Sequence, residues 1–315
     1  MSWPVVTRRR ATGWQANAAI DPVLFGRRIR SASATRGATI VNLTTSHTAS
    51  GNIGQCIGGA VDCGVFTNVD SQSTGTGVID PFYTVQNNGT QQGFNSDAPG
   101  STPNYDMKRG SGSGFTKAIQ VSAFGLVDIN GNVCNLCAIP YIRFLLDINE
   151  AGGNNAEFMS IDSLQLYVKA TNDIVSTTLA QLQVGATKVY DLDNLNGLGS
   201  NTIYTDYRLN SGSGSGDVIF LVPYSIFAGH TNDWLYLYGN YGNAGTIANG
   251  QVGCNGNNFL AVGDKDCGYS SSSGFEEWAR IDSPGGSSVP EPSTFGFAFI
   301  GLLAVMYFGR KRLAA

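Results

Sequence analysis

Short β-prone runs separated by dense turn signals constrain this chain more than any other feature of its sequence. Residues 163–168 alternate apolar and polar side chains, which is the pattern of a strand with one buried face. Residues 218–222 are apolar throughout, which indicates a central strand. Because the chain also lacks an amphipathic helix of three turns, the pattern predicts an all-β fold. We expect an antiparallel β-sandwich of jelly-roll type, followed by a single C-terminal transmembrane helix.

Further strands are expected from the same signals, which bound each run with glycine, proline, asparagine or aspartate. They are predicted at residues 38–43, 77–85, 118–129, 139–148, 187–192, 204–209, 217–223, 234–238 and 274–281. Residues 44–115 otherwise give no regular pattern.

The charge of the chain is low and uneven. Charged residues make up 13% of the sequence, and the net charge is −4. The basic residues are concentrated at the two ends, so that residues 37–290 carry a net charge of −12. An acidic body lacks the basic surface that nucleic acids need, and we expect no nucleic-acid partner.

Six cysteines fall into three pairs that are close in sequence. Six cysteines allow 15 pairings, but local pairing is the simplest arrangement in an oxidising compartment. A redox pair or a zinc site remains an alternative, most of all for the Cys-x-x-Cys pair. The pairs are Cys56 with Cys63, Cys134 with Cys137, and Cys254 with Cys267.

The C-terminal tail has three parts in a fixed order. A polar motif comes first, formed by Val289, Pro290, Glu291, Pro292, Ser293 and Thr294. Residues 292–309 then contain no charge over 18 positions, which as a helix would span about 27 Å, close to a membrane's apolar core. A basic cluster closes the tail, formed by Arg310, Lys311 and Arg312. An ordinary C-terminal anchor would share the last two parts.

The three parts together resemble the PEP-CTERM sorting signal of exported Gram-negative proteins. That resemblance implies transient anchoring in the inner membrane and cleavage near residues 290–292 by an exosortase, a membrane transpeptidase-like enzyme. Segments 144–149, 161–167, 209–216 and 274–278 are also similar to exported proteins that carry this tail. The resemblance therefore implies a destination at the cell surface or in an extracellular matrix.

The expected organisation has four segments. Residues 1–37 are basic without an apolar stretch of signal-peptide length, so they are predicted to be an atypical or mis-assigned leader. Residues 38–282 would form the β-sandwich and residues 283–289 a linker. Residues 290–315 would hold the sorting signal with its transmembrane helix.

Candidate catalytic chemistry is sparse. Only two histidines occur, His47 and His230, and no nucleophile-elbow motif accompanies them. Two carboxylate pairs have the residue types for glycoside hydrolysis, Asp147 with Glu150 and Glu276 with Glu277. The second pair would point to opposite faces of one strand, so we expect no enzyme.

Two binding sites are weighed against structural explanations. Asp128, Asn130 and Asn132 have the spacing of calcium-loop ligands, although a turn without metal explains them equally. Trp234, Tyr236 and Tyr238 share one face of a strand and would stack on sugars if exposed, although burial is favoured. The calcium would be structural, and no other cofactor is expected.

The predicted function is that of an exported structural protein of the cell surface or of an exopolysaccharide, biofilm-type matrix. The alternatives are a carbohydrate-binding module, which needs the aromatic stripe to be exposed, and a secreted glycan-active enzyme.

Overall fold

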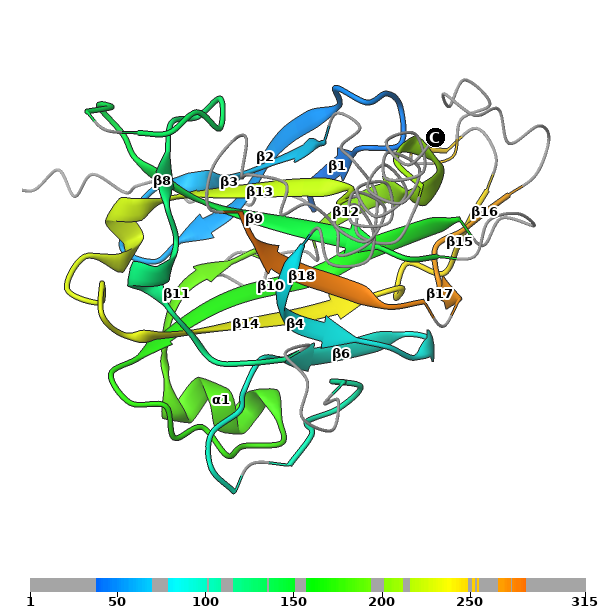
Figure 1. The fold of residues 1–315 in the computed structure, drawn as a ribbon. Helices are drawn as coiled ribbons and strands as arrows, with labels where there is room; N and C mark the ends of the chain where they lie inside the picture. Colours follow the sequence, from blue (N-terminus) through cyan, green and yellow to red (C-terminus); the bar gives the residue numbers. More distant parts are fainter. Residues whose placement is uncertain are drawn as a thin grey trace, which may run out of the picture. The chain divides into compact units, whose positions relative to one another are not determined.

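The computed structural model describes residues 38–69, 79–100, 102–108, 116–134, 136–150, 157–193, 201–211, 216–248, 251–252, 254, 266–272 and 274–281. These residues belong to one compact unit. Its strands are β1 (Ile40–Asn42), β2 (Ser50–Cys56), β3 (Val61–Asn68), β4 (Asp80–Val85), β5 (Asn88–Gly89), β6 (Gln91–Phe94), β7 (Ile119–Gln120), β8 (Leu126–Val127), β9 (Tyr141–Ile148), β10 (Phe158–Lys169), β11 (Thr187–Asp191), β12 (Thr202–Asp206), β13 (Val218–Pro223), β14 (Trp234–Tyr241), β15 (Thr246–Ile247), β16 (Cys267–Gly268), β17 (Ser271–Ser272) and β18 (Glu276–Arg280). The prediction of a mostly β fold is confirmed (Figure 1).

Within the described part of the chain, 14 strands form one hydrogen-bonded sheet. The order along its main path is β1-β12-β10-β11-β2-β3-β13-β9-β18-β4, and β14 pairs with β10, β6 and β7. The predicted jelly-roll of two antiparallel sheets differs from this in two respects. The main strands belong to one sheet, and β1 runs parallel to β12.

The long strand β10 explains why a single sheet can surround a core. Its first half pairs with β12 and its second half with β11, while β14 runs along its opposite edge. The pairing shifts register between Leu166 and Tyr167 on one edge and between Ile161 and Ser163 on the other. Such irregularities bend and twist a strand, which lets the sheet curl.

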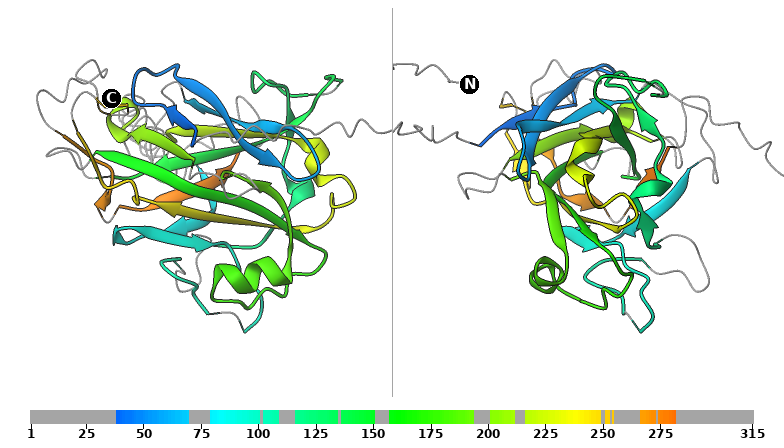
Figure 2. Two further views of the ribbon diagram at one scale, coloured as in Figure 1. Left: turned by 180° about the vertical axis from the view of Figure 1, so that it is seen from behind. Right: turned by 90° about the vertical axis from the view of Figure 1, so that its left-hand side faces the viewer.

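The curled sheet closes through residues 104–108, which lie between β4 and β6. Lys108 N–H donates to Thr84 O at 2.9 Å on the β4 side, and Asp106 N–H donates to Gln92 O at 3.0 Å on the β6 side. Since β6 pairs with β14 and β14 with β10, the strands make a closed ring, and the right-hand view of Figure 2 looks along it. Closure pairs the backbone groups that an open sheet edge would expose.

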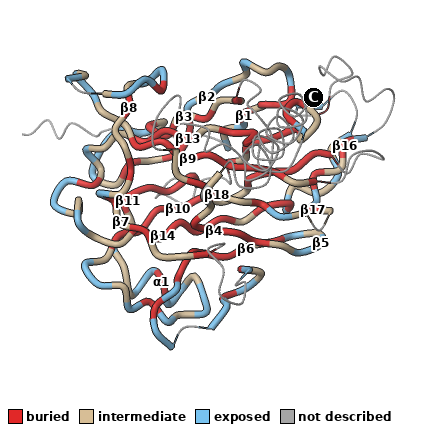
Figure 3. Tube along the Cα trace, in the orientation of Figure 1, coloured by how far each residue is buried: buried red, intermediate tan, exposed pale blue. Residues whose placement is uncertain are grey.

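The core lies inside this ring, and the strands around it are drawn largely as buried segments in Figure 3. Its centre is aromatic: Phe220 stacks on Phe66 with ring centroids 4.4 Å apart and contacts Tyr190 at 5.0 Å. The buried indole of Trp278 donates to Tyr241 Oη at 2.6 Å, so its polar atom is satisfied. Large aromatic side chains thus fill the ring and fix the strands around it.

A second, smaller cluster covers the outer face of β10 and β14. It lies beneath helix α1 (Leu179–Gly185), which contributes the buried side chain of Leu182. Thr178 caps the helix by accepting a hydrogen bond from Gln181 N–H, as N-terminal threonines do. The described helix is shorter than three turns, in agreement with the sequence pattern.

No helix among the described residues has the length and apolar character needed to cross a membrane. The predicted transmembrane helix of residues 290–315, the predicted linker and the N-terminal segment 1–37 lie outside the described residues. The described strands begin at Ile40 and end at Arg280. The domain boundaries at residues 38 and 282 stay predictions.

Candidate functional site

The three predicted cysteine pairs all form disulfides in the structure. The Cα atoms are 6.0 Å apart in Cys56–Cys63, 5.4 Å apart in Cys134–Cys137 and 5.6 Å apart in Cys254–Cys267. The first pair joins β2 to β3 across their connecting turn, and the third lies beside the aromatic rings of a satellite cluster. This confirms the local pairing of the cysteines, and their structural role stays a prediction.

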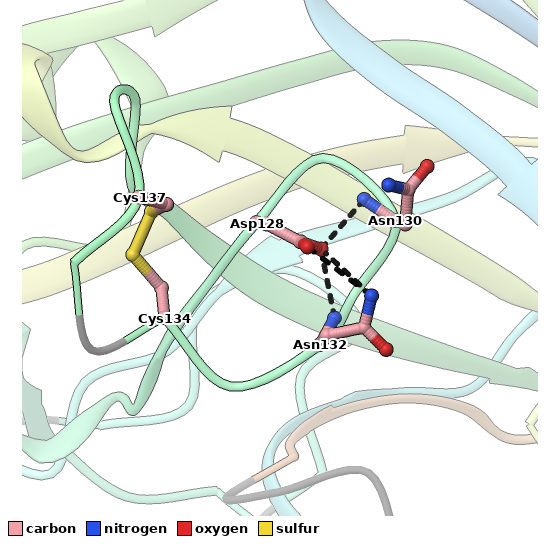
Figure 4. The surroundings of a disulfide bond; sticks show 5 residues. All are labelled: Asp128, Asn130, Asn132, Cys134 and Cys137. Atoms are coloured by element: carbon pink, nitrogen blue, oxygen red, sulfur yellow. Dashed lines mark hydrogen bonds between the residues drawn. A yellow bond between two sulfur atoms is a disulfide. The ribbon is translucent and has the colours of Figure 1, made fainter.

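The Asp128 loop is a hydrogen-bonded turn. One carboxylate oxygen, Oδ1, accepts from the backbone N–H groups of Asn130 and Asn132, both at 2.9 Å (Figure 4). The side-chain amide of Asn132 donates to Oδ2 at 3.1 Å. These donors lower the pKa of the Asp128 carboxyl, with the Asn132 side chain contributing most.

These hydrogen bonds support the explanation of this loop as a turn without metal, and the calcium site stays a prediction. Both oxygens of Asp128 already accept from N–H donors, and Arg143 Nη1 donates to Gly131 O at 3.2 Å from beneath the loop. A guanidinium in that place opposes a second cation. Among the described residues, no group of three or more acidic, histidine or cysteine side chains is arranged to hold a metal ion.

The aromatic stripe of β14 is buried, which is a correction to the sugar-stacking interpretation. Tyr236 and Tyr238 lie beneath α1 with exposures of 0% and 4%, and Trp234 is half-buried at the edge of the same cluster. Burial raises the pKa of both tyrosines. A carbohydrate platform needs open ring faces, so this stripe cannot serve as one.

The carboxylates pair across strands and not along the chain. Glu276 on β18 lies opposite Ile148 on β9, and its side chain points into the ring beside that of Glu150. Glu277, one residue on, lies opposite Asp147 on the outer face of the same two strands. Neither pair considered from the sequence meets in the structure.

The inner pair is a buried contact between two carboxyl groups. Glu276 is fully buried, and burial raises its pKa well above the usual range; the neighbouring Glu150 carboxyl raises it further and shares a hydrogen bond with it. Gln91 Nε2 donates to Oε2 of Glu276, and Ser272 N–H donates to Glu150 Oε2 at 2.6 Å. The raised pKa of Glu276 favours its protonated form, which can donate a hydrogen bond to Glu150.

A second group of carboxylates lies near the end of β9. Asp147 faces Glu277 across β9 and β18, and Asp217, just before β13, is close enough for Asp147 to affect its pKa. Burial, together with the neighbouring Asp147 carboxyl, raises the pKa of Glu277 to about 7. Burial likewise raises the pKa of Asp217, although Ile148 N–H donates to it at 2.6 Å. Like charges that face each other across strands favour protonation.

A groove of about 800 Å³ lies at the opposite end of β9 from the inner pair. It is bordered by Tyr141 at the start of β9, by Tyr224 after β13 and by two disulfide-stapled loops. Nine residues at ~3.3 Å each place the groove roughly 30 Å along the strand from Glu150. The carboxylate pairs therefore do not line this groove.

The two histidines lie in separate loops of the described structure. His230 Nδ1 lies 2.6 Å from the carboxylate of Asp233 within one turn. His47 lies in a turn before β2.

Gln91, Ser272 and the groove were missed by the sequence analysis. The segment that contains Gln91 has little β-prone character, and Ser272 lies in a serine run. The groove is built from loops whose proximity depends on strand order. The three cysteine pairs were the available signal, since two of them staple the groove's borders.

Comparison with known proteins identifies the tail. Residues 288–312 match the family model of the PEP-CTERM protein-sorting motif, which confirms the resemblance drawn from Val289–Thr294 and the basic cluster. The motif and the disulfides indicate an exported, extracytoplasmic protein that is sorted by an exosortase. No curated protein and no solved structure matches the chain significantly.

Proposed function

We propose that this chain is a non-enzymatic structural protein of the cell surface or of an extracellular polysaccharide matrix, delivered there through its C-terminal signal. The observation that carries the proposal is the motif at residues 288–312. The uncharged run and the basic cluster would hold the chain in the inner membrane until an exosortase cleaves it. The folded domain, whose closed ring of strands we call the barrel, would then be released from that anchor.

The features of the barrel suit a durable extracellular protein. Its strand edges are paired around the ring, and three disulfides staple its loops. Paired edges resist strand-mediated aggregation, and disulfides persist in oxidising surroundings. Both properties would help the folded protein to persist outside the cell.

The distribution of carboxylates supports a non-enzymatic role. Glycoside hydrolysis needs two carboxyl groups facing a substrate cleft. The residues that line the groove include one carboxylate, Asp62, while Glu150 and Glu276 are enclosed in the barrel. A glycan in the groove would therefore meet a single acidic group.

The sorting step is tested by the mature termini of the protein. In a strain with an active exosortase, intact-mass and peptide mapping should find a chain that ends near residues 290–292. A variant with Pro290, Glu291 and Pro292 changed to alanine should remain full length in the membrane fraction. Pro284→Ala, a proline outside the motif, should be processed as the native chain is.

A chain that still ends at Ala315 in that strain would contradict the sorting proposal. The matrix role is tested separately, by fractionation of cells with and without exopolysaccharide synthesis. The protein should move from the matrix fraction to the medium when the polysaccharide is missing. Conversion of a polysaccharide by the purified protein, lost in Asp147→Asn, would contradict the non-enzymatic role.

A further inference from the structure

An exposed apolar patch surrounds the groove at the end of the barrel where β9 begins. It consists of Val61, Ile129, Val133, Leu136 and Ile139, which are half-exposed to fully exposed. Three of them, Val61, Ile129 and Ile139, also line the groove of about 800 Å³. An apolar patch with a hollow at its centre is typical of an interaction site on a soluble domain.

Leu136 is the most exposed of these side chains, at 99%. It projects from the loop closed by the Cys134–Cys137 disulfide, whose next residues line the groove. The loop protrudes beside β8 in Figure 1. One face of the molecule thus carries both a projecting apolar side chain and an apolar hollow.

The residues that lead into this loop are fixed by hydrogen bonds. Asp128 accepts from the backbone N–H groups of Asn130 and Asn132 and from the Asn132 side chain, and Cys134 N–H donates to Leu126 O at 2.9 Å. The Cys56–Cys63 disulfide holds the opposite border, which bears Val61. A preorganised apolar surface loses little conformational entropy when it is covered.

We propose that this patch binds a second copy of the chain in an isologous dimer, with Leu136 of each copy inserted into the groove of the other. A two-fold interface joins the same patch on both copies, so it requires a projection and a hollow on one face. Asp62 is the one charged residue among the described residues that line the groove. Few charges would therefore be brought together when two acidic copies meet at the groove.

The exposed area of the five patch residues indicates how tightly two copies would bind. The five side chains expose roughly 300 Å² on each copy, at about 100 Å² for one fully exposed aliphatic side chain. Two copies would bury about 600 Å² from these residues, and the groove walls would add to this. Since stable interfaces begin near 1,200 Å², we expect a dissociation constant in the micromolar range.

Sedimentation equilibrium of the exported chain, between about 1 and 500 µM, tests the proposal. The native chain should pass from monomer to dimer over this range. Leu136→Asp and Val61→Asp should each weaken the dimer by at least about 100-fold, because a carboxylate would be buried at the interface. Val184→Asp is the matched control: Val184 is exposed on α1, away from the groove, and its variant should dimerise as the native chain does.

A native chain that remains monomeric at 500 µM would overturn the proposal, even if the groove bound a glycan or another protein. Equal dimerisation of Leu136→Asp and Val184→Asp would overturn it as well. Near-UV circular dichroism of each variant establishes that it is folded, and Leu136→Ser provides a second, uncharged variant. That variant should weaken the dimer by at least about 10-fold.

Discussion

The buried Glu276–Glu150 contact makes the stability of the barrel depend on pH. Burial raises the pKa of Glu276 in the folded chain well above 4.5, its ordinary value. The folded chain therefore keeps a proton that the unfolded chain releases above about pH 4.5. The stabilisation from this proton is complete below pH ~4.5 and is lost as the pH rises toward the pKa of the folded state.

The Glu276→Gln variant removes this proton without removing the contact. The glutamine amide donates to Glu150, as the protonated carboxyl does, and its carbonyl accepts from Gln91. One proton corresponds to about 1.4 kcal/mol per pH unit, so above pH ~4.5 the native chain should lose up to about that much per pH unit relative to the variant, until the pH reaches the folded-state pKa of Glu276. Near pH 4 the two free energies of unfolding should lie close together.

Denaturant unfolding at several pH values measures this difference. Disulfides are kept intact, and the fluorescence of buried Trp278 reports on the barrel. Asp97→Asn, which changes an exposed carboxylate, should give a curve of stability against pH parallel to that of the native chain. Parallel curves for Glu276→Gln and the native chain would refute the reasoning.

Three further predictions concern packing, disulfides and metal. Phe220→Ala should lower the free energy of unfolding by about 3–5 kcal/mol, because the ring of Phe220 contacts four other aromatic rings. Denaturant titration measures this loss, and the control Val184→Ala should change the free energy of unfolding by less than about 0.5 kcal/mol. Replacing Cys254 and Cys267 by serine should cost about 3 kcal/mol for their 13-residue separation, and an unchanged melting temperature would contradict a structural role. Calcium added to the metal-free protein should leave the melting temperature unchanged within about 1 °C, because Asp128 is already hydrogen-bonded; a rise of several degrees that is lost in Asp128→Ala would contradict this.

The central strands could be predicted because their side-chain pattern is local. The prediction for residues 217–223 differs from β13 by one residue, and the alternation at residues 163–168 lies within β10. Residues 118–129 were predicted as one strand, and this was wrong. The chain instead forms β7, a 3-10 turn at Val121–Ala123 and β8, because it crosses there from β14 to β9.

The hairpin of β2 and β3 was missed for a physical reason. These strands contain glycines where β-branched residues are expected. A Cβ atom at Gly54 would lie 2.2 Å from Tyr190 Oη, and one at Gly64 would lie 2.5 Å from the same oxygen. Only glycine fits at these two positions, because the Tyr190 side chain packs directly against the backbone there. The two strands therefore lack the alternation of side chains by which a strand is predicted from sequence.

The carboxylate contacts could not be predicted because they depend on register. Glu276 and Glu277 are neighbours in sequence, but a strand places them on opposite faces. Each then meets a residue from the end of β9, which the pairing of β18 with β9 determines. A shift of one residue would exchange the inner and outer partners, and no local pattern specifies that choice.

The disulfides connect the export of the chain to the conformation of the loops around the groove. Two of the three close the loops that border the groove, and one of these, Cys56–Cys63, also belongs to the buried core. These loops owe their conformation to turns and disulfides because their exposed apolar side chains have no core to pack against. Disulfides form in oxidising compartments and are rare in the cytosol. The patch around Leu136 would therefore take its final shape after export, and association through it would be restricted to the compartment that the C-terminal signal selects.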